Sequence, residues 1–352
     1  MRAQPRGFVH WVLHRLIPAL IIAAVLTAVI VAAAYRFGPE RFWLFSLLQY
    51  APYPVFLLPF IALCVLALPA GRVWVALALV GVALTTIELM GLELHAGETA
   101  HGSNHLRVLT FNVKDYITLR QKDGRTSLAD EIARHDPDIF VLQDARSFQQ
   151  DRIDATFARE VFAGRQYYTF GQYVVASRFP MRDCRNGWIS FRDEPHTYVA
   201  CVVSVRNRDV DLITTHFMTP RFGLAATRFN PLRGADEWMG NVNDRMTQAS
   251  LLSQDVKGLN RPVIVAGDLN APEQSMVVRA LLETGLRDAF SVAGRGFGYT
   301  WGHSLRFNLS FLRIDHILVS QAFRVTAAFV GDDAGSAHRP VIADLVLGDD
   351  GK

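Results

Sequence analysis

Charged side chains are scarce in the first 92 residues of this 352-residue chain, which hold six arginines, two glutamates and no lysine. Only eight of the 69 charged residues lie there, and the net charge of this part is +4, whereas residues 93–352 carry −1. This distribution excludes a uniformly soluble globular chain. It also excludes a strongly basic second part, so bulk charge gives no support for tight DNA binding. Disorder is excluded too, because half of the residues are apolar.

Several functional patterns are also missing. The sequence has no internal repeat, no glycine-rich phosphate loop and no CxxC pair, and it has only three cysteines. Cys64 lies inside an apolar run, where it serves as a small apolar residue. Cys184 and Cys201 lie in two neighbouring strand-like runs, and an antiparallel hairpin would bring them close together. They can form a disulfide in an oxidising compartment or stay as two free buried thiols, and the sequence leaves both alternatives open.

Long apolar runs fill the first part of the chain. Residues 16–35, 48–70 and 73–92 are each long enough to cross a bilayer at roughly 1.5 Å per residue. We therefore predict a transmembrane module at residues 1–92, formed by a bundle of about three transmembrane helices.

The arginines of this module predict its orientation. Arg2, Arg6, Arg15 and Arg72 lie on one side of the predicted membrane, and only Arg36 and Arg41 lie on the other. The side with more arginines faces the cytoplasm, so three crossings place residues 93–352 outside it. The alternative is a cleaved signal peptide at residues 1–34, which would leave the second part outside as well. We predict a multi-pass protein of the cell membrane with an extracytoplasmic second domain.

Strand-like and helical patterns alternate in the second part. Residues 93–105 form a polar connector, and a single domain is predicted at residues 106–348. Strands follow one another too often for a simple parallel sheet, so an α/β fold of two packed sheets flanked by helices fits better. The strand-like runs are residues 106–113, 138–143, 173–177, 188–191, 198–205, 210–215, 262–267, 313–320 and 341–347. The helical patterns are residues 126–135, 246–259 and 275–284.

Polar residues lie at or near the ends of six of these strand-like runs. Each residue alone is typical of a turn or of a structural histidine, but their joint order predicts one site at a sheet edge. Carboxylate and amide oxygens with few thiols favour Mg²⁺ or Mn²⁺ over zinc, and a His–Asp pair beside a metal suits the attack of water on phosphorus. These residues are Asn112, Gln143, Asp144, His216, Asp268, Asn270, Asp315, His316 and His338.

The segments GDLN, DPDIFVLQD, RIDHILVS and SAHRP resemble motifs of the endonuclease/exonuclease/phosphatase superfamily, which has the pancreatic-deoxyribonuclease fold. The resemblance covers about residues 105–348. It implies a four-layer α/β/β/α sandwich that hydrolyses phosphodiesters or phosphomonoesters with a divalent metal ion.

The same resemblance assigns roles to five residues. His216 would donate a hydrogen bond to a phosphate oxygen, and Asp268 would orient or deprotonate the attacking water. Asn270 would stabilise the transition state, while Asp315 would hold His338, the second catalytic imidazole, in the right tautomer.

The metal ligands implied by the resemblance are Asn112 and Asp144, and this sequence departs from the family pattern near them. Asp144 stands where the family usually has the longer Glu, and Ala337 replaces the Asp of the usual Ser-Asp-His. Lys114 stands where some members carry an acid, which would shift the charge at the metal. These departures favour a single metal ion of modest affinity.

Residues 217–245 are long for a connection and therefore predict a functional segment. Arg221 and Arg228 are candidate substrate-binding residues because guanidinium groups contact phosphate through two hydrogen bonds. The aromatic residues of the segment are candidates for contact with lipid. An ordinary solvated loop is the alternative. Arg245 and Gln248 match a recurring family position and are expected to brace the site.

The sequence as a whole favours a membrane-anchored, metal-dependent phosphoesterase that acts outside the cytoplasm, with a lipid-linked phosphate or pyrophosphate as the favoured substrate. Its layout resembles that of some bacterial family members, and the excess of 32 arginines over four lysines is typical of a GC-rich bacterial genome. One alternative is an exported endonuclease or exonuclease, which the charge of the domain disfavours. The other is a non-catalytic, membrane-tethered binding domain. The expected partners are the lipid bilayer and a phosphate-ester substrate, and no protein partner is indicated.

Overall fold

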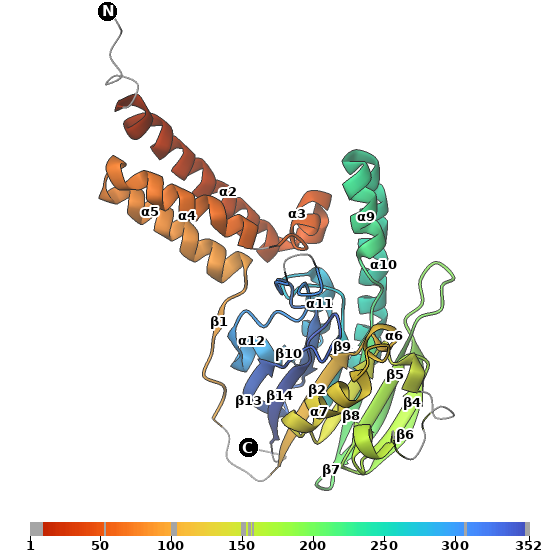
Figure 1. The fold of residues 1–352 in the computed structure, drawn as a ribbon. Helices are drawn as coiled ribbons and strands as arrows, with labels where there is room; N and C mark the ends of the chain where they lie inside the picture. The colour runs from red at the N-terminus through yellow and green to blue at the C-terminus, as the bar shows by residue number, and fades with distance from the viewer. Residues whose placement is uncertain are drawn as a thin grey trace, which may run out of the picture. The chain divides into compact units, whose positions relative to one another are not determined.

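The chain forms two compact units, Met1–Leu92 and Glu93–Lys352. The structure is a computed structural model, and it describes residues 10–52, 54–99, 104–148, 153, 156, 158–305 and 308–348. Figure 1 follows the chain from its N-terminal helices to the strands near the C-terminus. Arg2 and Arg6, on which the predicted orientation partly depends, and residues 100–103 of the connector lie outside the described residues.

The first unit is helical. Its main elements are α2 (Ile17–Phe37), α3 (Trp43–Leu48), α4 (Pro54–Ala67) and α5 (Arg72–Leu84), with π-helical turns at Val12–Leu16 and Thr85–Leu89. The continuous helices Val12–Phe37 and Arg72–Leu89 are long and apolar enough to cross a membrane, with mean hydropathy values of 2.8 and 1.7. These figures rest on length and composition alone.

The prediction of about three spans is wrong in number. The expected span at residues 48–70 is interrupted, because α3 ends at Leu48 and the next helical segment is Pro54–Ala70. Proline has no amide hydrogen to donate and fixes its own backbone angle, so it favours the first turn of a helix over its interior. The remaining segment would extend only about 25 Å, which is less than the roughly 30 Å of a bilayer core.

Small residues let the helices of this unit approach closely. Ile21 and Ala28 of α2 pack with Phe60 and Leu63 of α4. A Cβ added to Gly81 would lie 2.1 Å from Cε1 of Phe60, so only glycine fits where α4 and α5 meet. Large apolar side chains cover the outside of the bundle, among them Leu26, Ile30, Leu58, Val65 and Val73.

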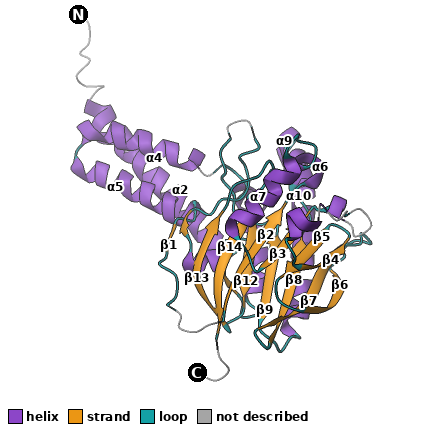
Figure 2. Ribbon diagram, turned by 60° about the horizontal axis from the view of Figure 1, so that its bottom comes forward, coloured by secondary structure: helices purple, strands orange, loops and turns teal. Residues whose placement is uncertain are grey.

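The second unit contains two six-stranded mixed sheets (Figure 2). In the first sheet the order is β10 (Arg287–Asp288), β12 (Asp315–Val319), β9 (Val263–Asp268), β8 (Arg208–His216), β7 (Thr197–Val205) and β6 (Met181–Trp188). In the second the order is β13 (Phe323–Val330), β14 (Val341–Leu347), β2 (His105–Asn112), β3 (Ile139–Gln143), β5 (Tyr173–Ser177) and β4 (Gln166–Phe170). Only the pairs β2–β3 and β8–β9 are parallel within these two sheets.

The alternation of side chains along each strand separates the layers. In β3, Ile139 and Val141 belong to the core between the sheets, whereas Phe140 and Leu142 belong to a second core on the outer face. The first sheet contributes Leu212 and Ile264 to the same central core. Helix α7 (Gly124–His135) covers the outer face of one sheet, and α10 (Pro231–Lys257) with α11 (Met276–Leu282) covers that of the other. The predicted α/β architecture of two mixed sheets flanked by helices is thereby confirmed.

Residues 217–245, which the sequence left open to an ordinary loop, are largely helical. They form α9 (Arg221–Phe229) and the first half of α10, whose contact with each other is extensive. Asn230 caps α10 because its side chain accepts a hydrogen bond from the Arg233 amide at 3.2 Å, and Pro231 occupies the first turn. The shorter helical segments of this unit include α6 (Asp115–Thr118), α12 (Ala289–Ala293), a 3₁₀ turn at Arg146–Phe148 and a π-helical turn at Ala158–Phe162.

The cysteine pair is joined. Cys184 on β6 and Cys201 on β7 form a disulfide between neighbouring antiparallel strands. The first of the two alternatives left by the sequence is therefore the one found. Cys64 is free and half-buried in α4.

Candidate active site

Strand pairing places the polar strand ends at one rim of the two sheets. Asn112 ends β2 directly beside Gln143 at the end of β3, because these strands are parallel and in register. His216 at the end of β8 lies beside Asp268 at the end of β9 in the same way. Asp315 begins the antiparallel strand β12 opposite Asp268. Residues as far apart in sequence as Asn112 and Asp315 therefore converge on one site.

Asp268 is the central group of this site, and it is fully buried. Its Oδ2 accepts a hydrogen bond from Nδ2 of Asn112 at 2.8 Å, and its Oδ1 accepts one from the backbone amide of Asn270 at 2.8 Å. Nε2 of His216 lies 3.4 Å from Oδ2, and Nε2 of His338 lies 3.8 Å from it. One carboxylate thus has a fixed orientation and faces two imidazoles.

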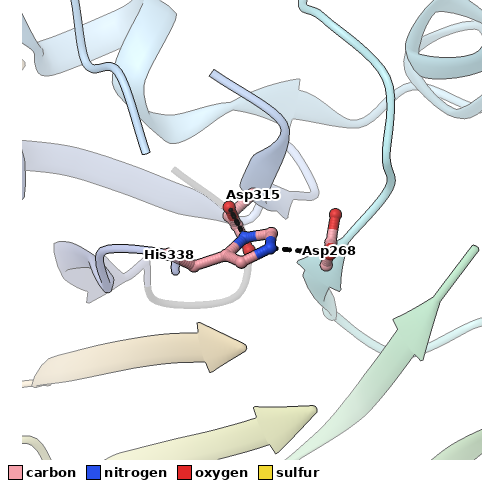
Figure 3. A group of neighbouring side chains, drawn as sticks. All are labelled: Asp268, Asp315 and His338. Atoms are coloured by element: carbon pink, nitrogen blue, oxygen red, sulfur yellow. Dashed lines mark hydrogen bonds and ion pairs between the residues drawn. The ribbon is translucent and has the colours of Figure 1, made fainter. Parts of the chain in front are cut away.

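His338 is held by Asp315. Nδ1 of His338 lies 2.9 Å from Oδ2 of Asp315, which leaves Nε2 directed toward Asp268 (Figure 3). The hydroxyl of Ser336 donates to the carbonyl of Asn112 at 2.7 Å and accepts from the amide of His338, which fixes the loop that carries the ring. Burial disfavours the imidazolium, but the charges of Asp315 and Asp268 outweigh it and raise the pKa of His338.

His216 is positioned from the neighbouring sheet. Its Nδ1 lies 2.8 Å from Oε1 of Gln172, and its backbone amide donates to the hydroxyl of Tyr173 at 3.1 Å. The same hydroxyl donates to the carbonyl of Thr197 at 2.7 Å, so Tyr173 links the two sheets beneath the site. Burial lowers the pKa of His216, and the attraction of Asp268 offsets only part of that effect. The two imidazoles therefore differ in their tendency to carry a proton.

Asn270 follows β9 in the left-handed backbone region, with φ of 48°, a conformation that Asn adopts more readily than most residues. Its Nδ2 donates to the carbonyl of Phe217 at 2.9 Å, and its carbonyl accepts from Nη1 of Arg245 at 2.8 Å. Gln248, one turn further along α10, accepts from the amide of Met218 at 2.8 Å. Arg245 and Gln248 thus brace the two segments that follow His216 and Asp268.

Lys114 and Asp144 form an ion pair at the same rim. Nζ of Lys114 lies 2.5 Å from Oδ2 of Asp144, and both side chains are largely buried. Both residues have positive φ angles, of 44° and 49°. Oδ1 of Asp144 lies 3.8 Å from Nδ1 of His216, so the pair belongs to the site. Burial alone would raise the pKa of Asp144, but His216 and Lys114 outweigh it and lower that pKa.

A family model described as the Endonuclease/Exonuclease/phosphatase family matches residues 109–338, a range that contains all of these groups. The chain belongs to this family. Among curated proteins no match is found. Solved structures of the same fold include a family protein from Bacteroides thetaiotaomicron, which is 18% identical with a TM-score of 0.53 over 69% of this chain and 95% of that one.

Two further similar structures come from other sources. TDP2 from D. rerio, complexed with single strand DNA product, is 16% identical with a TM-score of 0.53 and covers 69% of this chain and 99% of its own. A family protein from Bacteroides vulgatus is 19% identical with a TM-score of 0.52 over 69% and 99% of the two chains. At these identities the likeness shows the fold alone.

Members of the endonuclease/exonuclease/phosphatase family typically use divalent metals, and one group of residues here fits such an ion. Asp268, Asp315 and His338 are all buried and each offers one ligand atom, with all three atoms within 4.8 Å of one another. Oδ1 of Asp315 is buried and has no hydrogen-bond partner among the described residues. Two carboxylate oxygens and one imidazole nitrogen form a donor set that suits a divalent ion.

The metal ligands implied by the sequence, Asn112 and Asp144, have other partners. Nδ2 of Asn112 donates to Asp268, its Oδ1 accepts from the amide of Lys114 at 3.3 Å, and Asp144 is paired with the ammonium of Lys114. Their role as metal ligands stays a prediction.

The candidate substrate-binding residues lie apart from this network. Arg221 and Arg228 are exposed on α9, and within the described part of the chain no hydrogen bond or ion pair joins them to the site. Their contact with substrate also stays a prediction.

Sequence reasoning missed three supporting residues. Gln172 and Tyr173 lie at the turn between β4 and β5, and Ser336 lies in the loop before His338. A glycine-containing turn before a strand was the only local signal for Gln172 and Tyr173, and it predicts a hairpin, not a contact with a histidine of the other sheet. The sequence shows Lys114 only as a change of charge near the site, and its ion pair with Asp144 depends on the fold.

Proposed function

We propose that this chain is a metal-dependent phosphoesterase, anchored in a membrane, that hydrolyses a phosphate ester or pyrophosphate outside the cytoplasm. The observation that carries the proposal is the convergence of His216 and His338 on the single buried carboxylate of Asp268. Membership of a family described as endonuclease, exonuclease and phosphatase supports the class of reaction.

The carboxylate of Asp268 is suited to orient and deprotonate the attacking water. Asn112 and the amide of Asn270 hold its two oxygens, so its orientation is set before substrate binds. We assign Asn270 to this positioning, because its Nδ2 is already engaged with the carbonyl of Phe217.

The two imidazoles are suited to contact the phosphoryl group. Asp315 accepts from Nδ1 of His338, so Nε2 is the nitrogen that can donate to a phosphate oxygen. The raised pKa of His338 favours the imidazolium, which stabilises negative charge that develops on that oxygen. His216 has its Nδ1 engaged with Gln172 and directs Nε2 to the same carboxylate. A phosphoryl group between the rings would therefore meet the N–H of His338, whereas Nε2 of His216 donates only when that ring is protonated.

When His338 is neutral, Asp268, Asp315 and His338 could hold a Mg²⁺ or Mn²⁺ ion, which would supply electrostatic stabilisation of the phosphate charge; the ion and the imidazolium of His338 are alternatives. Asp315 and His338 are the members of that group which also form the Asp–His pair.

Membrane anchoring rests on the apolar helices of the first unit, and the extracytoplasmic location rests on the disulfide of the second. Two helices are long and apolar enough to cross a bilayer, and large apolar side chains are exposed on the first unit. The disulfide between Cys184 and Cys201 is typical of an oxidising compartment. With these two crossings three arginines of the first unit lie on each side of the membrane, so their distribution favours neither orientation.

A lipid-linked phosphate or pyrophosphate is the substrate class that we favour. Helix α9 is amphipathic, and it exposes Phe222 together with Arg221 and Arg228. An exposed aromatic ring beside guanidinium groups suits the boundary between lipid headgroups and acyl chains. An anchored enzyme also meets membrane substrates at a high effective concentration.

A nuclease is the second candidate. The similar fold of TDP2 from D. rerio was determined with a single strand DNA product, so this architecture accommodates nucleic acid. The net charge of −1 for residues 93–352 counts against tight binding of a polyanion.

A substrate panel tests the proposal. The full chain, purified in detergent, is incubated with a polyprenyl pyrophosphate, a chromogenic phosphodiester and single-stranded DNA, each with Mg²⁺ or Mn²⁺ and with EDTA. Release of inorganic phosphate from the polyprenyl substrate, lost on chelation and with Asp268→Asn but retained with Asp130→Asn, would support it. Asp130 is an exposed carboxylate on α7 and serves as the matched control. Cleavage of DNA alone would establish a nuclease instead. If no substrate is hydrolysed, the proposal fails and a non-catalytic binding domain is the remaining alternative.

A further inference from the structure

Lys114 is held firmly at the rim of the site. Its backbone carbonyl accepts hydrogen bonds from the amides of Ile117 and Thr118, and its amide donates to Oδ1 of Asn112. The hydroxyl of Thr118 donates to the carbonyl of Val113 at 2.6 Å, which closes the turn from β2 into α6. This turn gives Lys114 its left-handed backbone, and its side chain is only 13% exposed.

The ammonium of Lys114 lies where the carboxylates of the site concentrate negative charge. Its Nζ contacts Oδ2 of Asp144 at 2.5 Å, and both side chains are largely buried. The chain has only four lysines, and the other two within the second unit's described residues, Lys122 and Lys257, are exposed. A buried lysine is therefore specific to this position.

A divalent ion on Asp144 would compete with this ammonium. The ion would have to share the Asp144 carboxylate with the ammonium, whose Nζ already contacts Oδ2. Two cations on one carboxylate repel each other strongly in a mostly buried site. Hydrogen bonds to its carbonyl and amide fix the backbone of Lys114, and the ion pair with Asp144 holds its ammonium. The fixed cation and the ion cannot both be well accommodated on Asp144.

An ammonium group has three donors, and Asp144 uses one of them. The ammonium lies close to His216, because Asp144 contacts Nζ through Oδ2 and its Oδ1 lies 3.8 Å from Nδ1 of His216. A phosphate oxygen at this rim would meet a positive charge that the protein itself supplies.

We propose that Lys114 is a fixed cation that takes the place of a divalent ion at Asp144 and donates a hydrogen bond to a phosphate oxygen of the substrate. Any divalent ion is then confined to the group formed by Asp268, Asp315 and His338. The second half of this inference, the contact with substrate, rests on the proposed phosphoesterase function, whereas the first half does not.

Metal binding tests the first half without any assay of activity. Mn²⁺ is titrated into the full chain in detergent, and free Mn²⁺ is measured by electron paramagnetic resonance for the parent protein, Lys114→Ala, Lys114→Arg and the control Lys122→Ala. Lys114→Ala should bind Mn²⁺ at least about tenfold more tightly or gain a second equivalent per chain, because the competing charge is gone. The parent protein, Lys114→Arg and Lys122→Ala should bind no more than one equivalent.

Identical stoichiometry and affinity in the parent protein and Lys114→Ala, with unchanged thermal unfolding, would overturn this half. If Lys114→Ala does not fold, Lys114→Gln replaces it in the same titration. Adding Asp144→Asn to Lys114→Ala should remove the gained binding, and its persistence would also overturn the assignment to Asp144.

Steady-state kinetics on whichever substrate is hydrolysed test the second half. Lys114→Ala should lower kcat/KM by at least about tenfold, Lys114→Arg should recover part of the loss, and Lys122→Ala should behave as the parent. Unchanged kcat/KM in Lys114→Ala would overturn the contact with substrate. If no substrate is turned over by any variant, the proposed function fails, while the Mn²⁺ titration still decides whether Lys114 replaces an ion at Asp144.

Discussion

Asp315 accepts a hydrogen bond from Nδ1 of His338 at 2.9 Å, and both side chains are almost completely buried. The pairing fixes which ring nitrogen faces Asp268, and it stabilises the charged ring.

Asp315→Asn should therefore lower kcat by roughly 10²- to 10⁴-fold, since the amide keeps the shape but removes the charge that orients and stabilises the imidazolium. The pKa of His338 should fall, so the alkaline limb of the pH–rate profile should move to lower pH. Rate measurements between pH 5 and 10 check this, with Asp130→Asn as control. A profile that keeps the alkaline limb of the parent would show that Asp315 does not act through His338.

The stability of the second unit should depend on pH through the titration of His338. A folded-state pKa of His338 that lies above the unfolded value contributes stability that is full below pH of about 6.5. That contribution is lost as the pH rises through the raised value. The difference in thermal unfolding temperature between the parent protein and His338→Gln should consequently shrink from pH 6 to pH 9. A difference that grows over this interval would mean that His338 is neutral in the folded protein.

Arg245→Met should destabilise the segment that carries Asn270. Its Nη1 donates to the carbonyl of Asn270, and its guanidinium lies over the ring of Trp238 with 5.5 Å between Cζ and the ring centroid. Removing the donor leaves a buried carbonyl unsatisfied, which costs about 1–3 kcal/mol. The thermal unfolding temperature should fall accordingly, and kcat should fall with it. The control Arg279→Met on α11 should change kcat little. A loss of stability without any loss of kcat would show that Arg245 does not position the catalytic residues.

The disulfide gives a test of compartment. In cells, Cys184 and Cys201 should be protected from a maleimide reagent until a reductant is added, while Cys64 reacts after denaturation without it. Alkaline phosphatase fused after residue 105 should be active in the same cells. Two reactive thiols together with an inactive fusion would place the second unit in the cytoplasm.

Much of the second unit could be predicted because local sequence and tertiary environment agree there. The strand at residues 341–347 and the strand at residues 173–177 have the bounds that their β-branched runs predict. Runs that are apolar throughout belong to strands buried on both faces, as in β9 and β3. The motif residues at the ends of these strands then converge on one site, because pairing in register places the strand ends side by side.

Other elements could not be predicted from the sequence, because contacts with distant residues specify them. The strand β13 alternates weakly, with Arg324 and Thr326 among apolar residues, and it is specified by pairing with β14 and by the core beneath it. Glycine and asparagine in residues 217–245 lower helix propensity, yet the packing of α9 against α10 offsets that loss, and a Cβ at Gly234 would clash with the backbone of Ala226.

By itself, the sequence determined the α/β class of the second unit, the apolar character of the first and the set of strand-end carboxylates and imidazoles, since these depend on composition, periodicity and short motifs. Only the tertiary structure decided that the cysteines are joined, that one predicted span is too short, and that Asp315 holds His338 while Lys114 holds Asp144. These facts depend on distances between residues that are far apart along the chain or on the backbone angles of a single turn. Periodicity carries no information about either.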